Sequence, residues 1–169
     1  MISAPKPAPR EKKKPKRLAV RRDSLEAECD QLWQDCVKLR AGFKSELSNQ
    51  PAWNFNGEKV GGIVGHHICK KPNLWLRYSL ENGICVTDYE HDEIHFEKSP
   101  KQFMDEAEQL AGPEKFYRLL QLKHDTTKPV LTAVKEDLIF TRNVLIEKLK
   151  ESGDTYLLNV FLKTLTEKG

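Results

Sequence analysis

Four of the chain's five histidines lie in one window of 30 residues, between positions 66 and 95. The intervals within this window constrain the fold more than any other feature: the adjacent pair His66-His67 is followed by Asn82 and then by His91 and His95. In a helix, His91 and His95 lie one turn apart on the same face, so both imidazoles can reach one ion. A third ligand must then come from another element of the fold.

The adjacent pair lies in a short, apolar, β-branched stretch, residues 62–69, with glycines before it and a Lys-Lys-Pro run after it. These signals predict a strand. Because neighbouring strand residues point to opposite faces, one of His66 and His67 would be a ligand and the other a free base close by. Residues 83–87 predict a second strand, and a helix is expected to begin near Asp88 as its N-cap. The expected local order is strand, loop, strand, helix.

This order and spacing resemble the ββα-metal finger of HNH endonucleases, and the intervals match the His-His, Asn, His, His form found in the nuclease domains of bacterial colicins. Several flanking sequence segments resemble phage-encoded HNH proteins more closely. They are residues 29–33, 37–42, 73–78, 81–85, 99–103 and 114–117. The resemblance extends from residue 25 to residue 123.

The resemblance implies a role for each member of the histidine window. His66, His91 and His95 would hold one divalent ion (Mg²⁺, Mn²⁺, Ni²⁺ or Zn²⁺), and three protein ligands leave coordination positions for phosphate and water. His67 would be the general base, and Asn82 would fix the loop that carries the base, although in the family it is sometimes a ligand. Hydrolysis of a phosphodiester needs a deprotonated nucleophile and neutralisation of the developing charge, which a base and a metal supply together. The family's products would carry 5′-phosphate and 3′-hydroxyl ends.

The chain departs from the family at one set of positions. Phage HNH proteins of this kind often carry two Cys-x-x-Cys pairs that hold a structural zinc, and the matching positions here are Ser45, Ser48, Thr87 and Glu90. Since all four thiolates are replaced, no structural zinc held by cysteines is expected. Another part of the chain, such as the C-terminal helices, would then have to stabilise the finger.

Charge is distributed unevenly along the chain. Residues 1–22 have a balance of +8 and the remainder a balance of −5. The proline-containing basic segment 1–22 predicts a disordered arm that binds phosphates, and a solubilising or nuclear-localisation-like tail is the alternative. It lacks the apolar segment of a signal peptide. The residues expected to contact DNA are Lys12, Lys13, Lys14, Lys16 and Arg17 of the tail, and Lys70, Lys71 and Arg77 of the loop between the strands.

The fold class expected is α+β and mostly helical, with a two-stranded antiparallel hairpin plus helix, the ββα-metal finger, packed among flanking α-helices. The expected divisions are a disordered basic tail over 1–22, an HNH domain over 23–125 and a helical extension over 126–169. Helices are expected from Asp23 or Ser24 to 41, and over 100–111, 113–123, 130–151 and 154–167.

The four cysteines lack paired metal spacing and predict reduced, buried thiols. Their positions are Cys29, Cys36, Cys69 and Cys85.

The sequence therefore predicts an HNH endonuclease that nicks or cuts DNA in a bacterial or phage-infected host cytoplasm, with no membrane contact and with the C-terminal helices available for a homodimer or a protein partner. The main alternative is a catalytically inactive DNA-binding or recombination accessory protein built on the same finger, against which the presence of all five motif residues counts. A colicin-like toxin would need receptor and translocation domains, for which the chain has no room. A non-catalytic, metal-stabilised interaction module is a further alternative. Packaging, homing, recombination and host-DNA degradation all remain open as biological tasks.

Overall fold

A computed structural model describes residues 17–52, 61–69, 75–97, 99–153, 158–159 and 161–163 of the chain. These residues are mostly helical and include one two-stranded antiparallel sheet, which confirms the predicted fold class at that level. In chain order the elements are α1 (Arg17–Arg40), β1 (Ile63–His67), the 3₁₀ turn η1 (Leu80–Asn82), β2 (Gly83–Thr87), α2 (Asp88–Asp92), the π-helical turn η2 (Glu93–Glu97), α3 (Pro100–Ala111), α4 (Pro113–Leu122) and α5 (Leu131–Glu151).

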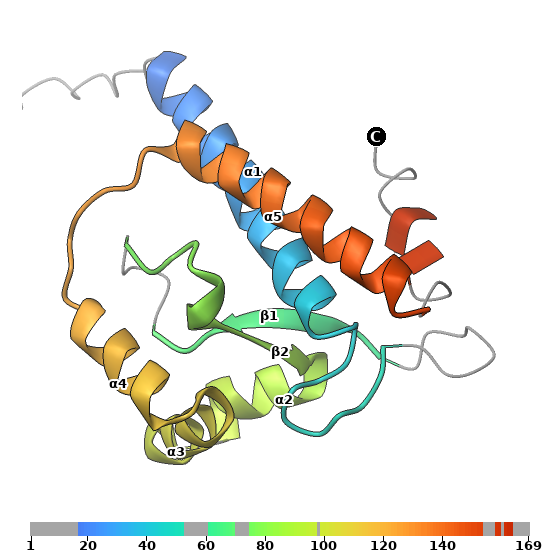
Figure 1. Cartoon of the computed structure of the whole chain (residues 1–169). Coiled ribbons are helices and arrows are strands. Elements are labelled where there is room, and N and C mark those ends of the chain that lie inside the picture. Colours follow the sequence, from blue (N-terminus) through green and yellow to red (C-terminus); the bar gives the residue numbers. More distant parts are fainter. Residues whose placement is uncertain are drawn as a thin grey trace, which may run out of the picture.

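The hairpin lies between two groups of helices: α1 and α5 run side by side on one of its faces, and α2, α3 and α4 lie on the other (Figure 1). The two long helices run in the same direction. Near the start of α5, the Cys29 thiol donates to the carbonyl of Leu131, and one heptad further the Cys36 thiol donates to the carbonyl of Leu138. All four cysteines are buried and free, as predicted.

The register of the hairpin decides which histidine faces which group of helices. His66 lies opposite Ile84, and His67 lies opposite Gly83. Residues directly opposite each other share a face of the sheet. Ile84 belongs to the core shared with α3 and α4, whereas Cys85, the next residue of β2, belongs to the core shared with α1. His66 is therefore directed toward α2, α3 and α4, and His67 toward α1.

Two strand glycines allow α1 to lie directly on the hairpin. A Cβ at Gly83 would come within 2.7 Å of Val37 Cγ2 and 2.8 Å of Trp33 Cζ2, and a Cβ at Gly65 would lie 3.1 Å from the Trp33 ring. Any larger residue at Gly83 would thus push the helix and the sheet apart. The close approach places the indole of Trp33, which is 1% exposed, against the end of β1.

Helix α1 begins at Arg17, so the expected start at Asp23 or Ser24 is wrong, and residues 17–22 are helical rather than part of a disordered tail. No proline or glycine interrupts residues 16–40, and Leu, Ala and Arg favour the helical state, which explains the extension. Residues 1–16, with the rest of the predicted tail, lie outside the described residues.

The helices after the hairpin match their predicted ranges closely. Ser99 caps α3 in a capping box with Gln102, and Pro100 occupies the first helical position, where its missing N–H costs nothing. Gly153, with a φ of 78°, ends the α5 segment as predicted. Of the predicted helix 154–167, residues 158–159 and 161–163 are described and are helical, and the remainder lies outside the described part of the chain.

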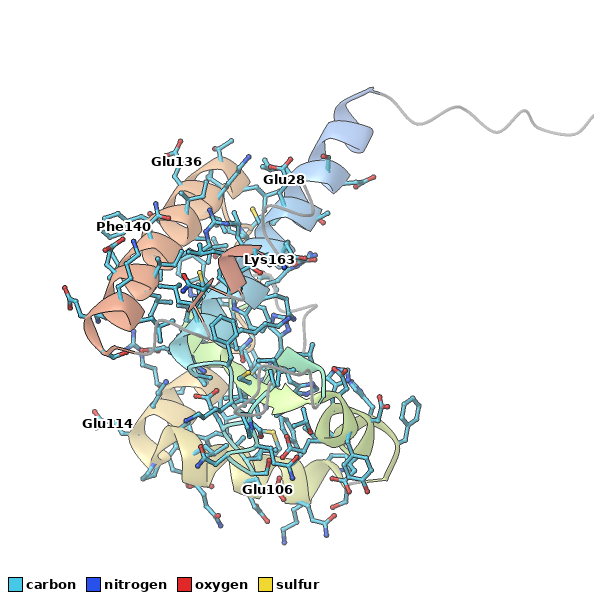
Figure 2. The ribbon with its side chains drawn as sticks, turned by 90° about the vertical axis from the view of Figure 1, so that its right-hand side faces the viewer. Glu28, Glu106, Glu114, Glu136, Phe140 and Lys163 are labelled. Atoms are coloured by element: carbon cyan, nitrogen blue, oxygen red, sulfur yellow. The ribbon has the colours of Figure 1, made fainter. Side chains whose placement is uncertain are left out.

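Helix α5 packs along α1, and its far side carries exposed groups. Glu136 and Phe140 project away from the body of the molecule (Figure 2), and the Phe140 ring is 71% exposed. Binding of a second copy or another protein through this helix stays a prediction. Within the described residues, no helix has both the length and the apolar character needed to cross a bilayer.

Candidate metal centre and neighbouring base

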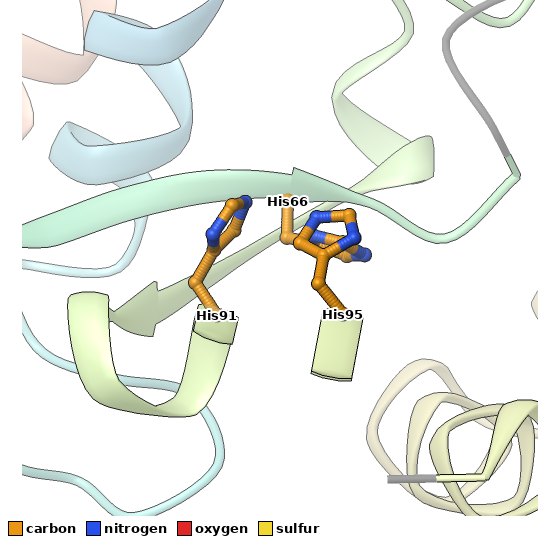
Figure 3. Close-up of side chains that lie close together, drawn as sticks. All are labelled: His66, His91 and His95. Atoms are coloured by element: carbon orange, nitrogen blue, oxygen red, sulfur yellow. The ribbon is translucent and has the colours of Figure 1, made fainter. Parts of the chain in front are cut away.

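Three histidines from three different elements converge on one point. His66 extends from β1, His91 from α2 and His95 from η2, and their rings face one another (Figure 3). Each residue offers a ring nitrogen, and the three nitrogens all lie within 4.8 Å of one another. The ring centroids of His91 and His95 are 4.5 Å apart, and that of His66 lies 5.2 and 5.1 Å from them. This triad can hold a metal ion.

The backbone that carries His91 and His95 differs from the regular helix that their spacing predicts. Thr87, not Asp88, is the N-cap: its hydroxyl accepts from the Glu90 backbone N–H while the Glu90 carboxylate accepts from the Thr87 N–H. The α-helix ends at Asp92, and a π-helical turn follows with His95 in it. Such single turns occur often at functional sites. The two imidazoles stay adjacent although the helix between them widens.

Burial and repulsion between neighbouring imidazoles favour the neutral forms of His66 and His91. Burial, and then the nearby His91, His95 and His67, lower the pKa of His66 to about 4. Burial, and then His95, also lower the pKa of His91. Since a metal binds the neutral form of imidazole, these two ligands need not lose a proton to bind an ion at neutral pH.

The lowered pKa of His66 predicts a loss of stability in acid when no metal is present. In the unfolded chain His66 takes up a proton below pH 6.5, whereas in the folded chain the ring stays neutral until the pH falls to about 4. The contribution of His66 to the free energy of unfolding is therefore fully present above pH 6.5 and is lost as the pH drops toward 4. The loss is roughly 2 kcal/mol between pH 7 and pH 5. Urea unfolding at these two pH values, in chelator, should show this loss in the parent chain and a smaller loss in His66→Asn. An equal loss in both would assign the effect to other groups.

His67 stays outside the triad and packs against α1. Its ring stacks on that of Trp33 with the centroids 3.8 Å apart and the planes 4° from parallel. Nε2 lies 2.8 Å from the backbone oxygen of Arg77. Because a carbonyl can only accept, Nε2 must carry the proton, so in the neutral ring the basic lone pair is on Nδ1. The strand alternation predicted for His66 and His67 is confirmed, and the ring of His67 is held in one tautomer.

Asn82 is fully buried and joins the two ends of the loop between the strands. Its Oδ1 accepts from the Cys69 backbone N–H at 2.7 Å, and its Nδ2 donates to the carbonyls of Cys69 and Leu76 at 3.0 and 3.1 Å. Cys69 lies two residues after His67. This bonding fits the predicted role of fixing the loop next to the base, and it engages both ends of the amide.

The four positions at which the sequence resemblance would place zinc cysteines lie together. The Ser45 hydroxyl donates to the Glu90 carboxylate at 2.7 Å, and the Thr87 backbone N–H donates to the same oxygen at 2.7 Å. Burial raises the pKa of Glu90, but hydrogen bonds from Ser48, Ser45 and Thr87 outweigh this and lower it. A hydrogen-bonded cluster around an ionised carboxylate therefore ties the turn after α1 to the start of α2.

The residues predicted to contact DNA are only partly described. Lys12, Lys13, Lys14, Lys16, Lys70 and Lys71 lie outside the described residues, and Arg17 is described only as the first residue of α1. Arg77 is described: its guanidinium makes two hydrogen bonds to Asp30, at 3.0 and 2.8 Å, and lies 3.4 Å from Glu26. Phosphate contact by Arg77 stays a prediction, and it would require these ion pairs to open.

Sequence reasoning missed the helix residues that surround the base. The apolar stripe over residues 23–41 predicts burial of Trp33 but not its stacking on His67, and no pattern marks Gln34 as a neighbour of β1. No protein-family model, curated protein or solved structure matches the chain. The function is therefore inferred from the geometry of these residues together with the resemblance in their spacing.

Proposed function

We propose that this protein is a metal-dependent HNH endonuclease that hydrolyses DNA phosphodiester bonds, with β1, β2 and the α2–η2 helix as its ββα-metal finger. The observation that supports this most strongly is the convergence of His66, His91 and His95, with His67 next in sequence to one of them. Metal-dependent hydrolysis of a phosphodiester needs a cation site and a general base close to each other. Strand β1 would supply one metal ligand, His66, and the base, His67, as adjacent residues.

The donor set fits a divalent transition metal. Three neutral imidazoles are ligands that suit Zn²⁺ and Ni²⁺, whereas Mg²⁺ prefers oxygen ligands. His66, His91 and His95 would hold the ion. When bound, it would supply a Lewis acid that stabilises the charge developing on the scissile phosphate and on the departing 3′ oxygen.

His67 would take the proton from the attacking water at Nδ1. Its Nε2–H remains bonded to the Arg77 carbonyl, which stabilises the positive charge that the ring acquires as it accepts the proton. His67 is the last residue of β1, so a phosphate that passes the end of the strand can approach His66 on one face and His67 on the other. This placement would bring the base and the metal ligands to the same phosphodiester.

The distribution of charged residues along the chain supports DNA as the substrate. The α2–η2 segment contains no Lys or Arg and several acids, so it would repel a phosphate backbone without a bound cation. The basic segment 1–22, with its balance of +8, supplies the opposite charge on the same chain. We propose that this segment holds the nucleic acid while the finger cuts it.

A plasmid assay tests the proposal. Supercoiled DNA is incubated with the purified chain and Mg²⁺, Mn²⁺, Ni²⁺ or Zn²⁺, with chelator as the blank, and nicked and linear products are resolved on a gel. We expect cleavage with at least one of these ions and none in chelator. Binding of DNA without cleavage in any ion would instead identify an inactive DNA-binding or recombination accessory protein.

Metal binding can be measured apart from cleavage. In titration calorimetry, we expect Zn²⁺ and Ni²⁺ to bind the parent chain more tightly than Mg²⁺, and His91→Ala to weaken Zn²⁺ binding by about 100-fold or more, because one of three ligands is removed. His124→Ala is the matched control, since this histidine is exposed and lies beyond α4. Equal affinity in the parent and His91→Ala would rule out the triad as the metal site.

A further inference from the structure

We infer that α1 positions the general base, with Asp30, Trp33 and Gln34 acting as positioning residues for His67. This inference rests on the proposed role of His67 as the base. The three residues have the spacing of one helix face, and each constrains the base or its immediate backbone through a different contact. Helix α1 would therefore belong to the nuclease centre, although it lies outside the strand, strand, helix unit.

Gln34 fixes the position of the strand. Its amide nitrogen Nε2 donates to the Gly65 carbonyl at 2.8 Å, and its Oε1 accepts from the Gly65 N–H at 2.7 Å. The side chain thus pairs with β1 in the way that a neighbouring strand would, at the edge away from β2. Gly65 directly precedes the two histidines. A shift of β1 along α1 would break both hydrogen bonds, so Gln34 holds the strand in one place.

Trp33 fixes the plane of the base. The indole Nε1–H donates to the Ser79 carbonyl at 3.1 Å, and the ring is 1% exposed, so the indole itself has little freedom to turn. The His67 imidazole lies flat against it, 4° from parallel. Rotation of the imidazole about its own χ2 would drive its edge into the indole. The stacking therefore selects one ring plane.

Asp30 acts through Arg77. The carboxylate binds the Arg77 guanidinium in a two-bond arrangement, which fixes more geometry than a single contact does. The Arg77 side chain is only 15% exposed, and the backbone carbonyl of the same residue accepts from His67. Anchoring the side chain on α1 keeps that carbonyl at the base. Asp30 would thus help to hold the proton on Nε2 and the lone pair on Nδ1.

Together these contacts define position, plane and tautomer, which are the three properties that a general base must have in order to reach its proton. A misplacement of about 1 Å can cost about 100-fold in rate. Loss of one positioning residue should therefore lower the maximal cleavage rate while the metal ligands, on the other face of the sheet, still bind.

The sharpest test replaces Gln34 by methionine, which has similar length but makes neither hydrogen bond. Gln31→Met is the matched control, because Gln31 lies on the same helix one turn earlier and bonds Asp35 of its own helix, not the strand. We expect Gln34→Met to reduce the maximal rate of plasmid cleavage by about tenfold or more, with the half-saturating DNA concentration and the Zn²⁺ affinity within about twofold of the parent. Gln31→Met should cleave as the parent does.

Two further measurements separate positioning from folding. Thermal unfolding establishes that both methionine variants are folded at the assay temperature. Trp33→Phe keeps a stacked ring, so it should retain more activity than Trp33→Leu at equal metal affinity. A Gln34→Met variant with the parent's maximal rate, or equal activity in the two Trp33 variants, would overturn the inference.

Nitrogen NMR of the His67 ring tests the inference without cleavage. The metal-free parent should show the Nε2–H tautomer alone, and Asp30→Asn, which weakens the anchor of Arg77, should show a mixture of tautomers, whereas Gln31→Met should match the parent. If the parent cut no DNA in any ion, the proposed function would be wrong, yet these spectra would still decide whether α1 orients the ring. A parent spectrum with mixed tautomers would refute the positioning by α1 even if the protein cleaves.

Discussion

Replacement of His67 by alanine should reduce plasmid cleavage by about 10²- to 10⁴-fold, the usual contribution of a positioned general base. The affinity for Zn²⁺ should stay within about twofold, because His67 faces α1 and the ligands face the opposite side of the hairpin. Cleavage is measured as the initial rate of loss of supercoiled plasmid, and metal affinity by calorimetry. His91→Ala should lose both properties, and His124→Ala should lose neither.

A second variant separates the chemistry of His67 from its packing. His67→Phe keeps an aromatic ring that can stack on Trp33 but has no nitrogen to accept a proton. It should therefore be as inactive as His67→Ala, and at least as stable in thermal unfolding. If His67→Phe cleaved at the rate of the parent chain, another group would have to be the base.

Replacement of Asn82 by alanine should lower the free energy of unfolding by about 3–5 kcal/mol, the largest stability effect that we expect from a single polar residue here. The change leaves the Cys69 N–H and the carbonyls of Cys69 and Leu76 without their side-chain partner in a region closed to water. Each buried group left unsatisfied costs about 1–3 kcal/mol. Urea unfolding in chelator, with metal excluded, measures the effect.

A second variant at position 82 and a control at an exposed amide test this explanation. Asn82→Asp keeps the shape but places a second carboxylate oxygen against two carbonyl oxygens, so it should be at least as destabilising at neutral pH. Asn143→Ala on α5 removes an exposed amide and should change stability by less than about 0.5 kcal/mol. A loss below about 1 kcal/mol in Asn82→Ala would show that water or a backbone shift replaces the missing hydrogen bonds.

Local signals in the sequence predict most of the secondary structure. The β-branched stretch around His66 and His67 does form β1, and Ser99-Pro100 does start α3, because strand propensity and capping depend on neighbouring residues. The period of two along a strand also predicts that His66 and His67 face opposite ways. The spacing of His91 and His95 predicts their adjacency, which survives the π-helical turn.

What the sequence does not reveal is the set of contacts between distant segments. Trp33 and His67 are 34 positions apart, and nothing in either segment marks the other as its partner. The ion pair of Arg77 with Asp30 spans 47 positions, and no local signal in either segment predicts it. The π-helical turn also has no local signature in residues 93–97. These features depend on how the elements pack, which propensities do not encode.

The parallel arrangement of α1 and α5 has a consequence for biosynthesis. Their thiol–carbonyl contacts join residues 102 positions apart, so the histidine centre lies within a loop that closes only after α5 has left the ribosome. Until then, the cysteine-bearing side of α1 has no cover, and Leu138 is absent from the core that contains Trp33. Such long-range contacts slow folding. The nascent chain would therefore form α1 early, and α1 would gain the support of α5 only after residues 131–151 have been synthesised.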